Sequence, residues 1–312
     1  MKKILFSILF ILLLNSAFAQ QDAQFSHYMF NNVAFNPAYA GMNGEVCLNF
    51  TSHQQWRGLE GAPISNLMTV DSNVKFLGQE GGIGIKILDD RVGFVQNFMA
   101  SGIFSYHKPI GLGTLGIGFD LGIFNKLFKP EWEFPDQSES ILPTDSRKLI
   151  FDMSGGLFYK LDNLYLGLSS THLIRPKFNF EAVTDGGTSS KIFLTNHYYL
   201  TGAYNIQLAN ALLDFTPSFL VKSDGVSLQT DINLMLLYNK KFWTAVTYRN
   251  EDALVFFAGT SVFNNLRLGL SYDVTLSKIR TVSTGTFEAN VGYCFSFGND
   301  RPAQKYHNVK SL

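Results

Sequence analysis

The chain has 312 residues, with 25 basic and 25 acidic side chains, two cysteines and an aromatic content of 14% that includes 29 Phe. This balanced charge argues against a nucleic-acid-binding protein, and two cysteines are too few for a disulfide-built scaffold, although one bridge could form. After residue 19 no stretch has the ~18 or more continuous apolar residues of a helical membrane span. An aromatic-rich chain of this kind favours strands.

Residues 1–19 predict export. Lys2 and Lys3 precede an apolar run, and Ala17-Phe18-Ala19 gives an A-x-A cleavage site directly before Gln20. The apolar run is shorter than the ~20 residues that a helix needs to span a bilayer. We therefore expect a cleaved signal peptide, with the mature chain beginning near Gln20.

Strand periodicity dominates the rest of the chain. Residues 113–123 have the sequence GTLGIGFDLGI, in which apolar side chains alternate with small or polar ones, and residues 226–238 and 287–297 repeat the pattern. This period of two predicts strands with one apolar and one polar face. About fourteen such segments occur, most of them near the ~9–11 residues of a tilted membrane strand. They lie near residues 45–53, 64–76, 82–89, 96–108, 113–124, 150–160, 163–173, 197–209, 211–223, 225–238, 241–250, 253–262, 265–275 and 285–297.

The connections between these segments alternate in length. The long ones, at 54–63, 125–149, 174–196 and 276–284, all follow odd-numbered strands, whereas the connections after even-numbered strands are short. Outer-membrane barrels show this asymmetry, with long outer loops and short periplasmic turns. A soluble β-sandwich is the alternative, but its strands usually run ~5–6 residues and nothing makes its loops one-sided. The sequence therefore predicts an all-β, transmembrane antiparallel β-barrel with both termini periplasmic.

Four segments follow from this pattern. Residues 1–19 are the expected signal peptide, residues 20–44 an N-terminal segment in the lumen or at the periplasmic mouth, residues 45–297 the outer-membrane barrel, and residues 298–312 a polar periplasmic tail. The expected location is the outer membrane, whose lipid is the first predicted partner.

Motifs for catalysis or cofactor binding lack their required context. The spacing G-x-G-x-x-G at residues 111–116 runs into an alternating strand, where its glycines would thin the lumen-facing side, rather than into a helix that could receive a pyrophosphate. Ser169, Ser170 and His172 lie near a strand end and could mimic a barrel hydrolase, which also needs an acidic or amide orienter. The motifs H-E-x-x-H, C-x-x-C and G-x-S-x-G do not occur. We predict no catalytic residue, cofactor or metal, and no enzyme.

Cys47 and Cys294 fall on the first and last predicted strands, which pair to close a barrel. Both lie on the polar, lumen-facing side of their alternation. A disulfide across this seam would need Cα atoms within ~7 Å, which depends on the register. Two small buried thiols are the alternative.

Several motifs resemble those of one family. Residues 21–31 (QDAQFSHYMFN) and 36–41 (NPAYAG) are similar to the opening of the PorP/SprF family of Bacteroidetes, and residues 53–63 (HQQWRGLEGAP) to its next signature. A third similarity is LDDRVGF at 88–94, followed by SYH at 105–107. The resemblance covers nearly the whole mature chain.

The resemblance implies an outer-membrane component of the type IX secretion system. Its partners would be other components of that system and, as cargo, a large secreted surface protein whose export or surface anchoring it supports, in some members a gliding adhesin. A passive porin or diffusion channel is the alternative function, since it would share every barrel feature. A barrel of about fourteen strands should have an interior that is mostly filled or narrowly open.

Two of the matching motifs are candidate structural or partner-contact sites. Turn-forming residues in the first predict a compact fold at the mouth or in the lumen. The second lies in the first outer loop, where an aromatic residue beside a cation suits either packing across the mouth or gripping a partner. The candidate residues are Asn36, Pro37, Tyr39 and Gly41 in the first motif and Gln55, Trp56, Arg57 and Gly58 in the second.

Overall fold

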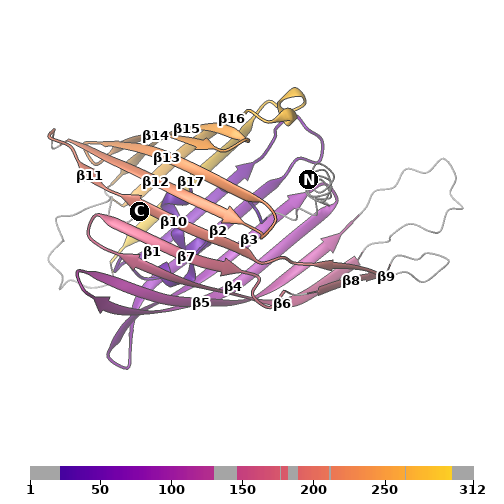
Figure 1. Cartoon of the computed structure of the whole chain (residues 1–312), viewed down its shortest axis with the longest axis horizontal. Coiled ribbons are helices and arrows are strands. Elements are labelled where there is room, and N and C mark those ends of the chain that lie inside the picture. Colours follow the sequence, from indigo (N-terminus) through magenta and orange to yellow (C-terminus); the bar gives the residue numbers. More distant parts are fainter. Residues whose placement is uncertain are drawn as a thin grey trace, which may run out of the picture.

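The computed structural model describes residues 22–129, 146–175, 177–181, 189–210, 212–263 and 265–296. Within these ranges fourteen antiparallel strands form one closed barrel (Figure 1), so the predicted fold is confirmed. The expected signal peptide and the polar tail lie outside the described residues. Among the described residues, no helix combines the length and the apolar character needed to cross a membrane.

The barrel strands follow one another around the wall in chain order, and β17 pairs with β1 to close it. They are β1 (Val46–Gln54), β2 (Ile64–Phe76), β3 (Gln79–Val92), β4 (Val95–Ile110), β5 (Gly113–Phe128), β6 (Ser146–Lys160), β7 (Leu164–Thr171), β10 (His197–Tyr204), β12 (Leu213–Ser223), β13 (Leu228–Tyr238), β14 (Phe242–Arg249), β15 (Ala253–Val262), β16 (Leu266–Thr275) and β17 (Thr286–Phe295). Each predicted strand has its counterpart in this series.

The differences from the predicted strands lie at their ends and in one connection. Strands β5 and β6 extend beyond the predicted ends, because Phe128 pairs with Ser146. The connection from β7 to β10, predicted as a loop, contains a separate hairpin of β8 (Lys177–Glu181) and β9 (Ser189–Phe193). The short strand β11 (Ile206–Gln207) continues β10 along β12 after Asn205.

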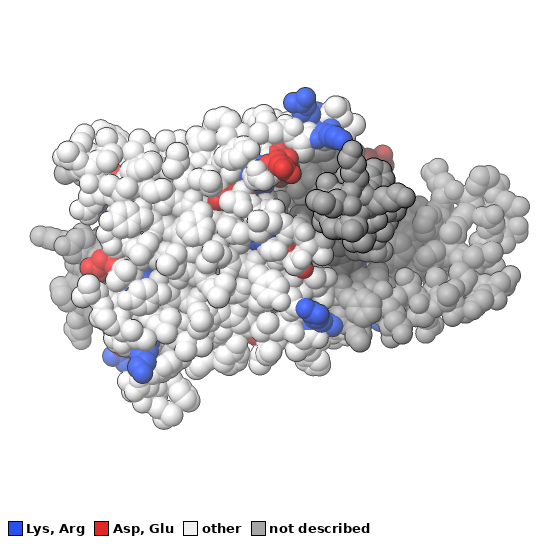
Figure 2. All heavy atoms as spheres, viewed as in Figure 1, with Lys and Arg blue, Asp and Glu red and all other residues white. Residues whose placement is uncertain are grey.

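The two faces of the wall have opposite character. On β5, Ile117, Phe119 and Leu121 are exposed, whereas Asp120 between them is buried and points inward. Apolar residues facing outward suit lipid, and polar ones facing inward suit a lumen. Figure 2 accordingly shows a surface on which few charged side chains appear.

The long connections gather at one end of the barrel, here called the long-loop end. In an antiparallel barrel, connections that follow β1, β5, β7 and β16 emerge from the same end, and these are the long ones. The last of them contains the 3-10 helix η4 (Lys278–Thr281). The hairpins at the opposite end, after β2 and β4, have two-residue turns at 77–78 and 111–112.

Residues 22–43, here called the luminal segment, lie inside the barrel. The segment contains three 3-10 helices, η1 (Tyr28–Phe30), η2 (Asn32–Ala34) and η3 (Pro37–Tyr39). Helix η3 contacts β4, β5 and β6, and η2 contacts β2. Most of the segment is buried, so it forms the hydrophobic core of the molecule together with inward-facing side chains of the wall.

Glycines make room for this core. A Cβ atom on Gly118 of β5 would lie 2.4 Å from the Ala38 amide nitrogen, and one on Gly82 of β3 would lie 1.9 Å from the Ala40 carbonyl oxygen. Both distances are shorter than atoms can approach, so any side chain here would displace the luminal segment. Gly116, the last glycine of the G-x-G-x-x-G spacing, faces the Ala38 carbonyl in the same way. These glycines therefore thin the wall against the segment.

Candidate functional site: the luminal segment and its contacts with the wall

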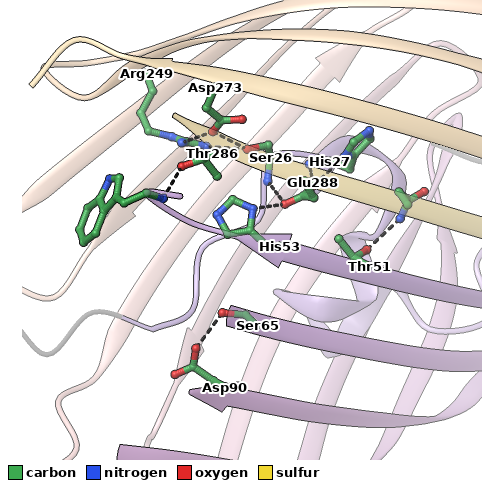
Figure 3. Close-up of polar contacts among 12 residues, drawn as sticks. Ser26, His27, Thr51, His53, Ser65, Asp90, Arg249, Asp273, Thr286 and Glu288 are labelled. Atoms are coloured by element: carbon green, nitrogen blue, oxygen red, sulfur yellow. Dashed lines mark hydrogen bonds and ion pairs between the residues drawn. The ribbon is translucent and has the colours of Figure 1, made fainter. Parts of the chain in front are cut away.

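The luminal segment is first held by a buried carboxylate. Glu288 of β17 is fully buried and accepts hydrogen bonds from the backbone amides of Ser26 (2.8 Å) and His27 (2.7 Å). Its two carboxylate oxygens also contact Nδ1 of His27 and Nδ1 of His53 of β1, each at 2.6 Å (Figure 3). A buried carboxylate needs this many donors, because an unpaired charge away from water is costly. Glu288 thus joins the luminal segment to both strands at the seam.

A second charged group lies beside it. Arg249 of β14 is buried and binds Asp231 of β13 (Nε to Oδ2, 3.1 Å) and Asp273 of β16 (Nη1 to Oδ2, 2.9 Å). Its Nη2 donates to the Ser26 hydroxyl at 3.2 Å, and that hydroxyl donates to Asp273 at 2.9 Å (Figure 3). The guanidinium is balanced by one carboxylate of the adjacent strand β13 and one of β16, two strands away, as buried charges have to be. Ser26 and His27 therefore form the central clamp of the segment.

Aromatic packing fills the space around the clamp. The centroids of the Phe30 and Trp243 rings are 4.6 Å apart in a T-shaped arrangement, and the Arg267 guanidinium carbon lies 4.2 Å from the Phe30 ring centroid. Such aromatic pairs and cation–π contacts each add stability beyond the area that they bury. Further along the segment, the Tyr39 ring packs 4.9 Å from Phe158.

The first predicted motif lies in the lumen and binds the wall through its backbone and side chains. The Asn36 side chain accepts from the Ala38 amide at 3.0 Å, capping η3, and donates to the Leu157 carbonyl of β6 at 2.9 Å. Pro37 occupies the first position of η3. The Tyr39 hydroxyl donates to Asn43 at 2.9 Å.

Gly41 of the same motif is fixed by its backbone. Its φ of +75° lies in the left-handed region, which glycine tolerates best. Its amide donates to the Asp71 carboxylate of β2 at 2.8 Å, and a Cβ atom on it would lie 2.7 Å from the Gly82 Cα. The four predicted residues are thus positioned to hold the segment against the wall.

The second motif lies apart from the first, in the connection between β1 and β2 at the long-loop end. The Arg57 amide donates to the Gly285 carbonyl, and the Thr284 amide donates to the Arg57 carbonyl, both at 2.8 Å. The Trp56 amide donates to the Thr286 hydroxyl at 3.0 Å. The Gln55 amide donates to the Pro63 carbonyl at 2.9 Å, which closes the two ends of this connection on each other. Backbone groups of this loop therefore bind residues 284–286, just before and at the start of β17. Arg57 and Gly58 remain exposed.

The hydrolase hypothesis finds no support in the side-chain geometry. The Ser169 hydroxyl donates to the Phe35 carbonyl at 2.7 Å, and the Ser170 hydroxyl to the Thr171 carbonyl at 3.4 Å. Both ring nitrogens of His172 contact carboxylates instead. A nucleophile hydrogen-bonded to a base is the starting point of serine hydrolysis, and these residues do not form that pair.

The cysteines meet at the seam. Cys47 pairs directly with Cys294 in the β1–β17 ladder, their Cα atoms are 4.1 Å apart, and a disulfide joins their sulfur atoms. This register meets the distance condition that the sequence alone could not fix. The bridge links strands 247 residues apart in the chain.

Comparison with solved structures supports the barrel class. The CymD monoaromatic hydrocarbon channel is similar with a TM-score of 0.52 at 9% sequence identity, over 87% of this chain and 94% of that one. The Ralstonia pickettii toluene transporter TbuX has a TM-score of 0.48 at 12% identity, covering 87% and 93% of the two chains. The outer membrane protein Omp33 of Acinetobacter baumannii has a TM-score of 0.46 at 8% identity, covering 81% and 100%. At these identities the likeness concerns the fold alone.

Comparison of the sequence identifies the family. No curated protein matches the chain. The model of the family described as type IX secretion system membrane protein PorP/SprF matches residues 17–293. The match includes the whole luminal segment and all the barrel strands, except for the last two residues of β17. The chain therefore belongs to the PorP/SprF family of type IX secretion system membrane proteins, and its barrel is of the outer-membrane kind.

Proposed function

We propose that this barrel is a docking component of the type IX secretion system in the outer membrane, and that it supports export or surface anchoring of a large secreted surface protein. The observation that carries the proposal is the filled lumen. Residues 25–33 of the luminal segment are all buried inside the wall. A barrel filled in this way acts through its ends and not through its interior.

The size of the barrel supports the same conclusion. Barrels of ~16–18 strands leave an aqueous channel, whereas smaller ones are filled by side chains or hold small ligands. Fourteen strands around a buried segment leave no path for a folded protein. The cargo therefore has to cross the membrane elsewhere, and this protein holds either the cargo or another secretion component.

The long-loop end is the proposed contact surface. We place it at the cell surface, because outer-membrane barrels carry their long loops there. In this arrangement the signal peptide directs export of the chain, and the tail lies in the periplasm. The loop between β1 and β2 is fixed by backbone hydrogen bonds to Thr284 and Gly285 and by the Trp56 amide, which donates to the Thr286 hydroxyl. It therefore presents the exposed Arg57 and Leu59 on a rigid support. Arginine is among the residues that most often carry the binding energy of a protein interface. A gliding adhesin is one class of cargo that fits this role.

A genetic experiment tests the proposal. Deletion of the gene should abolish surface display of one large protein, while uptake of small nutrients stays normal. Complementation with Arg57→Ala should restore barrel assembly but reduce display, whereas Lys108→Ala, at an exposed position of β4 toward the opposite end, should restore both. Normal display of all surface proteins in the deletion strain would refute the proposal.

A diffusion channel remains the second candidate because CymD, which shares the barrel fold, is described as a monoaromatic hydrocarbon channel. Conductance in a planar bilayer separates the two functions. The docking role predicts little conductance for the intact protein and open currents after removal of residues 22–43. Large, steady currents through the intact protein would favour the channel.

A further inference from the structure

Asp22, at the start of the luminal segment, faces two histidines of the wall. His172 directly follows β7, and its Nε2 lies 2.8 Å from Oδ1 of Asp22. His197 is the first residue of β10. Its Nε2 accepts a hydrogen bond from the Asp22 backbone amide at 3.4 Å, and its Nδ1 lies 3.6 Å from Oδ2 of Asp22. The two imidazole rings are 6.1 Å apart, and one ligand atom from each of the three residues falls within 4.8 Å of the others. Two imidazoles and a carboxylate at this spacing are ligands that zinc takes.

The Nδ1 atom of each imidazole already has a hydrogen-bond partner. Nδ1 of His172 contacts the Asp152 carboxylate of β6 at 2.6 Å, and Nδ1 of His197 contacts the Thr195 carbonyl at 3.0 Å. Histidines that ligate a metal nearly always donate their other N–H to a carboxylate or a carbonyl, which fixes the tautomer and the ring orientation. This arrangement leaves Nε2 of His172 facing the Asp22 carboxylate. Nε2 of His197 accepts from the Asp22 backbone amide, a contact that the metal ion would replace.

The carboxylate is oriented in the same manner. Oδ2 of Asp22 accepts from the Thr171 hydroxyl at 2.9 Å and from the Tyr199 hydroxyl at 2.8 Å, so Oδ1 is the oxygen turned toward His172. Lys222 donates to the Asp22 carbonyl at 2.7 Å and uses neither carboxylate oxygen.

The backbone adds an independent sign that the position is specialised. His172 has a φ of +56°, in the left-handed region that a non-glycine residue keeps only where its surroundings enforce it. Its carbonyl accepts from the Asn196 side chain, and the next amide, of Leu173, donates to the Met153 carbonyl, both at 2.8 Å. The chain thus holds this imidazole in one place despite the strain.

We propose that Asp22, His172 and His197 bind a divalent transition-metal ion of the zinc class, with water as the remaining ligand and Asp152 and Thr195 as the groups that orient the two imidazoles. The ion would fasten the beginning of the luminal segment to β7 and β10 at the long-loop end. In the metal-free protein an ion pair takes its place.

Metal binding to the purified full-length protein tests the site. A protein without a histidine tag, stripped with a chelator and exposed to zinc, should retain one zinc ion per chain by elemental mass spectrometry. Cobalt(II) should give the visible absorption of a tetrahedral ion. The double variant His172→Gln/His197→Gln should lose both signals. Asp152→Asn should weaken zinc binding about 10- to 100-fold, as loss of a group that orients a ligand typically does.

A matched control separates this site from other histidines. His107, which is also buried in the wall, contacts the Ser105 hydroxyl at 3.0 Å, and His107→Gln should bind zinc as the unchanged protein does. If the double variant fails to assemble, His197→Gln alone provides the test, because it leaves the Asp22–His172–Asp152 contacts in place. A folded, unchanged protein that binds neither zinc nor cobalt, or that binds them equally well after His197→Gln, would overturn the proposal and leave the cluster as an ion pair only.

Discussion

His27 offers both its backbone amide and its ring Nδ1 to the same oxygen of Glu288, at 2.7 and 2.6 Å. The two contacts fix the imidazole and the chain direction of the luminal segment at once, because a single acceptor determines the position of two donors. Glu288 belongs to β17, the strand that closes the barrel against β1. The position of the segment is therefore coupled to closure of the barrel.

Glu288→Gln should loosen the luminal segment. The neutral amide cannot accept from every donor that the carboxylate serves, and breaking a buried charged pair usually costs ~3–5 kcal/mol. We expect a lower free energy of unfolding in detergent and faster chymotrypsin cleavage in residues 22–43. Glu60→Gln, at an exposed position of the first long connection, is the control and should leave both measurements unchanged. Equal protease resistance in the two variants would show that Glu288 does not hold the segment.

Gly41→Ala should destabilise the docked segment through steric overlap. The added Cβ would lie 2.7 Å from the Gly82 Cα and 2.8 Å from the Ser72 carbonyl oxygen. The control is Gly78→Ala: its φ of +78° is nearly that of Gly41 (+75°), but nothing lies within 4 Å of its Cβ position. Both variants bear the cost of a left-handed alanine, so the difference between their unfolding free energies, expected at ~1–3 kcal/mol, measures the overlap. Similar values for both would exclude a tight contact at Gly41.

The Cys47–Cys294 bridge should form in the exported protein. Intact mass spectrometry under non-reducing conditions is expected to show a mass lower by two hydrogens, and a thiol reagent should label the cysteines only after unfolding and reduction. The variant Cys47→Ser/Cys294→Ser should still assemble, because the β1–β17 ladder continues along the seam, but with its unfolding free energy lowered by ~2–4 kcal/mol. Two free thiols in the untreated protein would exclude the bridge.

Much of the fold was predictable because the membrane imposes a simple pattern. A strand between lipid and lumen must alternate, so the fourteen strands and their order followed from the positions of residues such as Phe119 and Asp120. Strand ends were less certain. The pairing of Phe128 with Ser146 lies beyond the regular alternation, and only the register reveals it.

The contacts inside the lumen were not predictable in the same way. The family motif indicated Asn36 and Gly41, but its sequence did not determine whether the N-terminal segment lies at the periplasmic mouth or in the lumen. Glu288 stood out only as a polar residue in an alternating strand, and its partner His27 is 261 positions away. A signal was present, since a charged residue on the inward face needs a partner, but naming that partner requires the three-dimensional structure. The Asp22 cluster was missed for the same reason.

Phe30→Ala should remove the aromatic contact that fills the lumen beside the clamp. The ring is 7% exposed and lies between Trp243 and the Arg267 guanidinium, so its loss should leave a cavity and cost ~3–5 kcal/mol. Phe119→Ala is the control, because that ring is 45% exposed on the outward face of β5 and its removal opens no internal cavity. The expected result is a marked loss of unfolding free energy and a rise in single-channel conductance for Phe30→Ala alone. If the conductance of Phe30→Ala stays that of the unchanged protein while its stability falls, the ring supports the fold without sealing the lumen.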